Sequence, residues 1–209
     1  THGHVTPWVW REDWDDREFD ALADLQSRQG VAFPMHEGAA VMNTETGELV
    51  PRDGETQGEI VLRGNAVMKG YYKNEAATGA ALHDGWFFSG DAAVWHENGY
   101  IQIKDRLKDV IISGGENISS VEVEGYLYRH PAVAAAAVVA KPDETWGEVP
   151  CAFVELKPGD DVGAEEFLDW CRGQMAGFKR PKHVVFGELP KTSTGKIQKF
   201  VLRQRANEG

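Results

Sequence analysis

The chain has 209 residues, 42% of them hydrophobic and 10% aromatic, so it can bury a core in one domain or in two small ones. A net charge of −11 argues against general nucleic-acid binding, and no segment has the pattern of a membrane span or a signal peptide. Cys151 and Cys171 lie in apolar segments, which favours buried thiols over a disulfide and indicates a cytoplasmic setting.

The first half of the chain predicts one helix followed by short strands. Phe19, Leu22 and Leu25 have helical spacing within residues 16–28. The elements expected next are strands at 38–42 and 58–63, a helix at 74–82, and strands at 86–88, 92–95 and 100–103. Asn98-Gly99 predicts a hairpin turn, Gly90-Asp91 a second turn, and residues 104–109 a polar linker.

The second half predicts a compact α+β unit. Ser119 and Glu122 have capping-box spacing at a helix start, and His130-Pro131 ends that helix. The other expected elements are strands at 110–112, 133–140, 149–156 and 183–186, and helices at 164–175 and 196–205. We place the domain boundary near Lys108, which gives domains 1–107 and 108–209.

Positive charge is concentrated at the C-terminal end, where residues 178–209 contain eight basic and two acidic side chains. Such a tail on an acidic protein suits a phosphate-rich small ligand, although Arg203 and Arg205 also fit a solvated helix face. Within the tail, Phe178, Arg180 and Lys182 place cations beside an aromatic ring, as an adenine and its phosphates require. The alternative interpretation is that these residues form an exposed loop that binds no ligand.

Four other sites in the sequence could bind a ligand or stabilise charge during a reaction. The Asp91 carboxylate could hold a ribose diol or bond its own backbone, and Arg106 could hold a phosphate or form a surface ion pair. Ser113-Gly114-Gly115 allows a close backbone approach or a plain turn. Lys196 ends a polar loop without phosphate-loop spacing. A pair of charges at about 4 Å contributes about 1 kcal/mol in water but about 4 kcal/mol at an effective dielectric near 20, so Lys196 needs a closed site.

Together these motifs resemble the AMP-forming acyl-CoA synthetases of the adenylate-forming superfamily, from residue 30 onward. The resemblance rests on Gly-Tyr-Tyr-Lys-Asn at 70–74, Trp-Phe-Phe-Ser-Gly-Asp at 86–91, Asp-Arg-Leu-Lys-Asp-Val-Ile at 105–111, Ser-Gly-Gly-Glu-Asn-Ile at 113–118, Val-Glu-Val-Glu at 121–124, Trp-Gly-Glu at 146–148, and Pro-Lys-Thr at 190–192 with Lys196. Within the superfamily the chain looks most like medium-chain fatty-acid and methylmercaptopropionate CoA ligases.

The resemblance implies an acid–thiol ligase that uses ATP and coenzyme A. A carboxylate attacks the α-phosphate to give an acyl-adenylate and pyrophosphate, and the coenzyme A thiol then displaces AMP after a small domain rotates. By this resemblance Asp91 and Arg106 bind the nucleotide, Lys196 stabilises charge at the α-phosphate, and Lys108 is the hinge. The residues implied in coenzyme A binding are Ser113, Gly114, Gly115, Trp146, Phe178, Arg180 and Lys182.

The chain departs from the family pattern at its beginning. It lacks the family's Gly/Ser/Thr-rich phosphate loop and the Thr-Glu pair that positions Mg²⁺, so the magnesium ligand is expected in a missing N-terminal part. We therefore expect the β-rich end of the large domain followed by a small α+β lid, inactive without the remainder of the large domain. The absence of an initiator Met fits such a fragment.

The histidines show no metal-binding spacing beyond His2 and His4, so we expect no structural metal. The expected partners are a small carboxylic acid, ATP and coenzyme A, with no nucleic acid or membrane, and a homodimer is left open. Two other functions also stay open: a non-catalytic module that binds AMP or coenzyme A, and an adenylating enzyme that passes its acyl group to a carrier protein.

Overall fold

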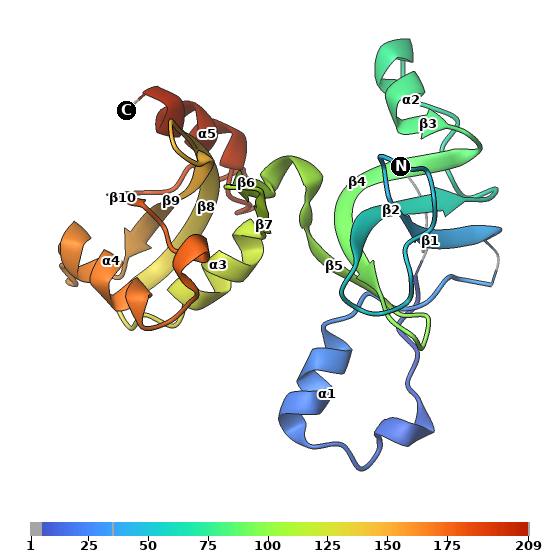
Figure 1. Cartoon of the computed structure of the whole chain (residues 1–209), viewed down its shortest axis with the longest axis horizontal. Helices are drawn as coiled ribbons and strands as arrows, with labels where there is room; N and C mark the ends of the chain where they lie inside the picture. The colour runs from blue at the N-terminus through green and yellow to red at the C-terminus, as the bar shows by residue number, and fades with distance from the viewer. Residues whose placement is uncertain (1–5, 35, 209) are drawn as a thin grey trace. The chain divides into compact units, whose positions relative to one another are not determined.

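The computed structural model describes residues 6–34 and 36–208, within which the chain forms two compact units, Thr1–Leu107 (unit 1) and Lys108–Gly209 (unit 2) (Figure 1). Unit 1 is mostly strand, and unit 2 packs helices on a sheet. The mixed α+β class predicted from the sequence is thereby confirmed. No helix in the described ranges is long and apolar enough to cross a bilayer.

Unit 1 is built on an antiparallel five-stranded sheet. Its helices and strands are α1 (Phe19–Gln26), β1 (Gly38–Met42), β2 (Gln57–Arg63), α2 (Glu75–Ala81), β3 (Leu82–His83), β4 (Trp86–Trp95) and β5 (Ile101–Arg106). β4 pairs with β2 along one edge, while β3 and β5 share its other edge, and β1 extends the sheet beyond β2. β4 therefore places its side chains at the centre of the unit.

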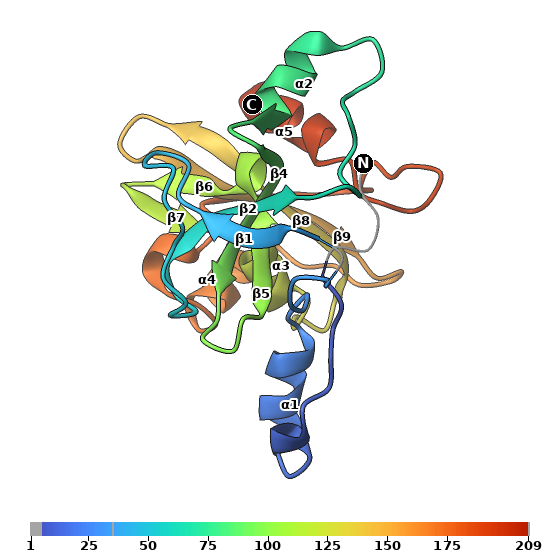
Figure 2. The ribbon, with the colours of Figure 1, turned by 90° about the vertical axis from the view of Figure 1, so that its right-hand side faces the viewer.

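The segment before the sheet packs through tryptophans. Trp14 is 2% exposed and lies 5.5 Å from the Trp8 ring and 5.3 Å from the Tyr100 ring. The Tyr100 hydroxyl donates to the Val9 carbonyl, which ties this segment to the β4–β5 hairpin. The α1 helix that follows buries none of its own residues and stands away from the sheet (Figure 2).

Unit 2 has a second five-stranded sheet, in which β9 pairs with β8 on one edge and with β10 and β6 on the other. Its elements are β6 (Ile111–Ser113), β7 (Glu116–Ile118), α3 (Ser120–Leu127), β8 (Val133–Asp143), β9 (Gly147–Leu156), α4 (Ala164–Arg172), β10 (His183–Phe186) and α5 (Lys199–Glu208). α3 and α4 cover one face of this sheet and α5 covers the other (Figure 1).

Strand alternation divides the apolar residues of β8 between these two faces. Ala136 and Val138 join the core under α3 and α4, whereas Ala137 and Val139 join the core under α5. The predicted capping box is confirmed in part, because the Ser119 hydroxyl accepts the amide of Glu122 at 3.2 Å.

Two local predictions were wrong. Gly90-Asp91 is not a turn between two strands, since β4 runs unbroken through it and accommodates it as a bulge. The segment 104–109 is not a linker throughout, because β5 continues to Arg106 and a 3-10 helix, Leu107–Asp109, follows. The short strand β7 was missed. The helices predicted at 164–175 and 196–205 form as α4 and α5 with shifted ends.

The two cysteines are free and buried, as predicted. Burial raises the pKa of the Cys171 thiol to about 11 and also raises the pKa of Cys151. We expect neither thiol of the folded chain to react with an aromatic disulfide reagent at pH 7.5, and both to react in urea. Absorbance of the released thiolate measures this, and rapid reaction of either thiol without denaturant would contradict the burial.

Candidate functional site

Asp91 and Arg106 face each other across neighbouring strands of unit 1. They are cross-strand partners of β4 and β5, and Arg106 Nε lies 2.8 Å from Asp91 Oδ1. The Arg106 side chain is 53% exposed, whereas that of Asp91 is 23% exposed. Because a carboxylate has two oxygens with several acceptor positions, this arrangement combines an acceptor for a diol with a donor for a phosphate.

A third charged residue near this pair, Glu59, was not predicted from the sequence. It lies in β2, is only 7% exposed, and accepts the Gly90 amide at 2.7 Å through Oε1. Burial raises the pKa of Glu59, as does the charge of Asp91, while the Gly90 amide and His83 act in the opposite direction. The available signal was its position directly before the apolar run 60–62 of a buried strand.

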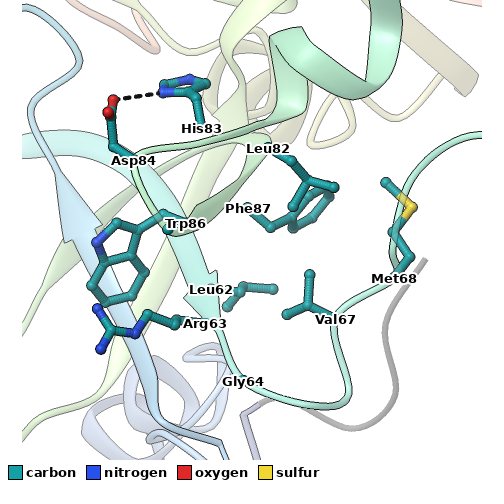
Figure 3. Close-up of a pocket in the computed structure, with 11 residues that line it drawn as sticks. Leu62, Arg63, Gly64, Val67, Met68, Leu82, His83, Asp84, Trp86 and Phe87 are labelled. Carbon is teal, nitrogen blue, oxygen red and sulfur yellow. Dashed lines mark hydrogen bonds and ion pairs between the residues drawn. The ribbon is translucent and has the colours of Figure 1, made fainter. Parts of the chain in front are cut away.

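Two clefts lie along β4, of which one adjoins Glu59 and Gly90. One, of about 520 Å³, is lined by Glu59, His83, Phe88 and Gly90 among others, and the His83 ring is stacked on Phe88 at 4.0 Å. The other, of about 440 Å³, is shown in Figure 3.

Figure 3 shows apolar side chains of the second cleft, including Leu62, Leu82 and Phe87, pointing toward one another. Arg63 lies over the Trp86 ring of the same cleft, with 5.6 Å from its guanidinium carbon to the ring centroid. The surroundings of β4 therefore offer apolar surface as well as charge.

Lys196 lies in unit 2, on the loop between β10 and α5. The Thr192 amide donates to the Lys196 carbonyl at 2.8 Å and the Lys196 amide to Thr192 Oγ1 at 3.1 Å, which closes the loop on itself. Lys191, at the base of the loop, is tied to Glu155 at 2.9 Å. The Lys196 side chain is exposed, and among the residues described no ion pair holds its ammonium. It is thus available to a ligand outside the unit.

Lys108 is exposed in the 3-10 helix Leu107–Asp109, at the first position of unit 2. The residue after it is held firmly, because Asp109 forms an ion pair with Arg203 of α5. Only 11% of the Asp109 side chain and 26% of the Arg203 side chain are exposed. The interpretation of Arg203 as part of a solvated helix face was therefore wrong.

Gly114 and Gly115 form the two-residue turn between β6 and β7, with φ of 60° and 88°. Trp146 packs directly on this turn: its carbonyl accepts the Gly114 amide at 2.8 Å, and a Cβ added at Gly114 would lie 2.7 Å from Trp146 Cε3. Ser113 pairs with Gly147 in the adjoining ladder. Four of the residues assigned to coenzyme A are thus brought into one cluster, formed by Ser113, Gly114, Gly115 and Trp146.

Phe178, Arg180 and Lys182 lie between α4 and β10. Phe178 is 43% exposed, and Lys182 is exposed directly before β10, with its amide bonded to the Pro150 carbonyl of β9. Arg180 is less available, since its Nε donates to the Met175 carbonyl at 3.2 Å. β6 and β10 pair with the same edge of β9, so the glycine turn and Lys182 share that edge.

Within residues 6–34 and 36–208, no group of three or more His, Cys, Asp or Glu side chains could hold a metal ion. His2 and His4 lie outside the described residues. We therefore assign no residue to Mg²⁺ and derive no step through it.

The chain is similar to known CoA ligases, and part of it matches a domain family. Residues 122–196 match the AMP-binding enzyme C-terminal domain. The whole chain is 56% identical to part of an acetate–CoA ligase of Humulus lupulus, covering 38% of that protein. It is 53% identical to part of the peroxisomal acetate/butyrate–CoA ligase of Arabidopsis thaliana, covering 37% of it. The chain thus spans well under half the length of these relatives.

Solved structures agree with the sequence comparison. ATP-bound MatB from Rhodopseudomonas palustris matches with a TM-score of 0.77 and 35% identity, over 86% of this chain and 35% of that one. The o-succinylbenzoate CoA synthetase of Bacillus subtilis, in complex with an acyl-adenylate, matches with a TM-score of 0.75 and 33% identity, over 89% of this chain and 36% of that one.

Replacing Gly114 tests the packing of the glycine turn. Gly114→Ala and Gly115→Ala both force an L-residue to positive φ, which costs about 1–2 kcal/mol. Only at Gly114 does the new Cβ collide with Trp146, so Gly114→Ala should lower the free energy of unfolding of unit 2 further. Urea denaturation measures the free energy of unfolding of both variants. The difference in stability between the two variants should shrink in a Trp146→Ala background. Equal losses of stability for the two variants in every background would contradict the packing.

Proposed function

The chain corresponds over its whole length to the C-terminal portion of AMP-forming acyl-CoA ligases, and on that premise we propose that it serves an ATP-dependent acid–thiol ligase acting on a short- or medium-chain carboxylic acid. The observation that carries the proposal is the charged pair of Asp91 and Arg106 in unit 1, together with an exposed Lys196 in unit 2 that forms no ion pair with the residues the structure describes. The names of related proteins, which specify acetate, butyrate and 2-methylpropanoate, support a short acid.

The proposed reaction has two steps. In the first, a carboxylate oxygen of the acid bonds to the α-phosphorus of ATP, and the bond to pyrophosphate breaks. In the second, the sulfur of coenzyme A bonds to the acyl carbon, AMP leaves, and the thiol proton is released. Unit 1 is proposed as the end of the large domain and unit 2 as the lid.

In the first step Asp91 is proposed to accept hydrogen bonds from the ribose hydroxyls, and Arg106 to contact ribose or phosphate. The ammonium of Lys196 is proposed to offset charge that develops at the α-phosphate, an interaction worth several-fold more in a dry site than in water. Lys196 lies on a self-closed loop with an exposed side chain, which supports its approach to a ligand.

For the second step, Lys108 is proposed as the hinge. The Asp109–Arg203 ion pair supports a pivot at Lys108, because it fixes the next residue to α5. The backbone turn at Ser113, Gly114 and Gly115, walled by Trp146, is proposed to pass the pantetheine arm. Phe178, Arg180 and Lys182 are proposed to contact the nucleotide end of coenzyme A, Lys182 being more exposed than Arg180.

The sequence predicts a cytoplasmic location for the ligase, whereas one relative is named as peroxisomal. A homodimer likewise stays open. The thioester kinetics of a Lys182→Ala variant distinguish coenzyme A from another acyl acceptor.

The role of Lys196 is tested in the complete ligase of which this chain is proposed to be the C-terminal portion. Lys196→Ala should slow acid-dependent pyrophosphate release by about 10²–10³-fold, the usual effect of removing one group that stabilises developing charge. Lys157→Ala is the control, since that ammonium donates to the Pro131 carbonyl and is assigned no role in the proposed reaction. Pyrophosphate release at the wild-type rate in the Lys196 variant would exclude the assigned role.

The role of Lys182 is tested by the thioester half-reaction. Lys182→Ala should raise the KM for coenzyme A about tenfold or more, because a charge-assisted hydrogen bond to a phosphate contributes about 1.5–3 kcal/mol. Pyrophosphate release should be unaffected. Unchanged thioester kinetics, combined with transfer of the acyl group to a carrier protein, would favour the alternative acceptor.

A further inference from the structure

The segment Ser89-Gly90-Asp91 interrupts the central ladder of unit 1. In the β2–β4 pairing Glu59 opposes Ala92 and Val61 opposes Phe88, so three residues of β4 stand opposite Ile60 alone. Such a bulge turns side chains away from the regular alternation of a strand, and bulges are over-represented beside active sites. Here the bulge decides where the Asp91 carboxylate points.

Glu59 replaces the ladder partner that the bulge removes. Its Oε1 accepts the Gly90 amide at 2.7 Å, a distance typical of a charge-assisted hydrogen bond. Gly90 has a φ of 76°, which a residue with a side chain rarely adopts. The next amide, of Asp91, donates to the Ser89 hydroxyl at 3.1 Å. The bulge is thus held by side chains.

Glu59 is an unfavourable choice if its only task is to satisfy one amide. It is 7% exposed and close enough to Asp91 for the two negative charges to oppose each other, which together raise the pKa of Glu59. A neutral glutamine offers the same carbonyl acceptor without that cost. What holds the bulge is thus the side-chain acceptor that Glu59 offers to the Gly90 amide, and a glutamine at this position also supplies that acceptor.

The Asp91 carboxylate is constrained from the opposite strand as well. Arg106 of β5 holds Oδ1 at 2.8 Å, while Glu59 of β2 holds the backbone one residue earlier. These contacts come from the two strands that flank β4, so the aspartate is fixed at both its backbone and its side chain.

We propose that Glu59 is a positioning residue, which fixes the Ser89-Gly90-Asp91 bulge so that the Asp91 carboxylate is presented to the ribose diol of the nucleotide. This inference rests on the proposed function, in which Asp91 binds that diol. Glu59 itself contacts the backbone of β4 and acts only through Asp91.

The first experiment uses amide hydrogen exchange of the 209-residue chain, followed by NMR. Glu59→Ala should speed exchange of the Gly90 amide about tenfold or more, in keeping with the loss of a hydrogen bond to a charged acceptor. Amides of the β2–β4 ladder should keep their protection, which distinguishes a local effect from unfolding. Glu59→Gln should retain most of the protection, and the exposed Glu97→Ala of the β4–β5 hairpin should change nothing.

The second experiment uses the complete ligase. Glu59→Ala should raise the KM for ATP about tenfold and leave the KM for the acid unchanged, with Glu59→Gln restoring most of the affinity. In an Asp91→Ala background, Glu59→Ala should have no further effect, because the two residues act as one unit.

The inference is overturned if Glu59→Ala leaves the KM for ATP at the wild-type value, if its effect adds to that of Asp91→Ala, or if Glu59→Gln is as impaired as Glu59→Ala. A wild-type ligase that releases no pyrophosphate would instead refute the proposed function and the ribose role with it. In that case the exchange of the Gly90 amide still decides whether Glu59 holds the bulge.

Discussion

Backbone amides that lose their ladder partner must find another acceptor, and in both sheets of this protein a glutamate supplies it. Glu59 accepts from Gly90 in unit 1. In unit 2, Glu148 accepts from Ile112 beside the glycine turn, Glu124 accepts from Val138 on the edge strand β8, and Glu155 accepts from Leu189 after β10. Each contact supplies a side-chain acceptor to a backbone amide at a bulge, beside a turn, on a strand edge or after a strand end.

The residues proposed to act on ligands stand at these same interruptions. Asp91 follows the bulge that Glu59 holds, and Gly114 and Gly115 form the turn that begins two residues beyond the Glu148 contact. Lys196 belongs to the loop whose base is tied down by Glu155 through Lys191. A regular ladder occupies its backbone groups and fixes the direction of its side chains, so irregular points are where a sheet can present groups to a ligand.

Much of the fold was predictable because it depends on neighbours in sequence. Strands 38–42 and 183–186, the cap at Ser119 and a turn at Gly114-Gly115 follow from side-chain pattern, capping chemistry and positive φ. The predicted turn at Gly90-Asp91 failed for a physical reason: Gly-Asp favours a turn locally, but pairing of β4 with both β2 and β5 outweighs that preference. The site was predictable only as a set of residues, through the resemblance of its motifs to a family.

The sequence by itself determined most of the helices and strands, the two buried thiols, and the motifs that resemble those of AMP-forming ligases, because these depend on local chemistry and spacing. Only the tertiary structure decided which side chains support those motifs. Glu59 reaches Gly90 across 31 residues, and Arg203 reaches Asp109 across 94. No periodic pattern in the sequence reveals such contacts, because they depend on which strands pair and on which helix end packs against them.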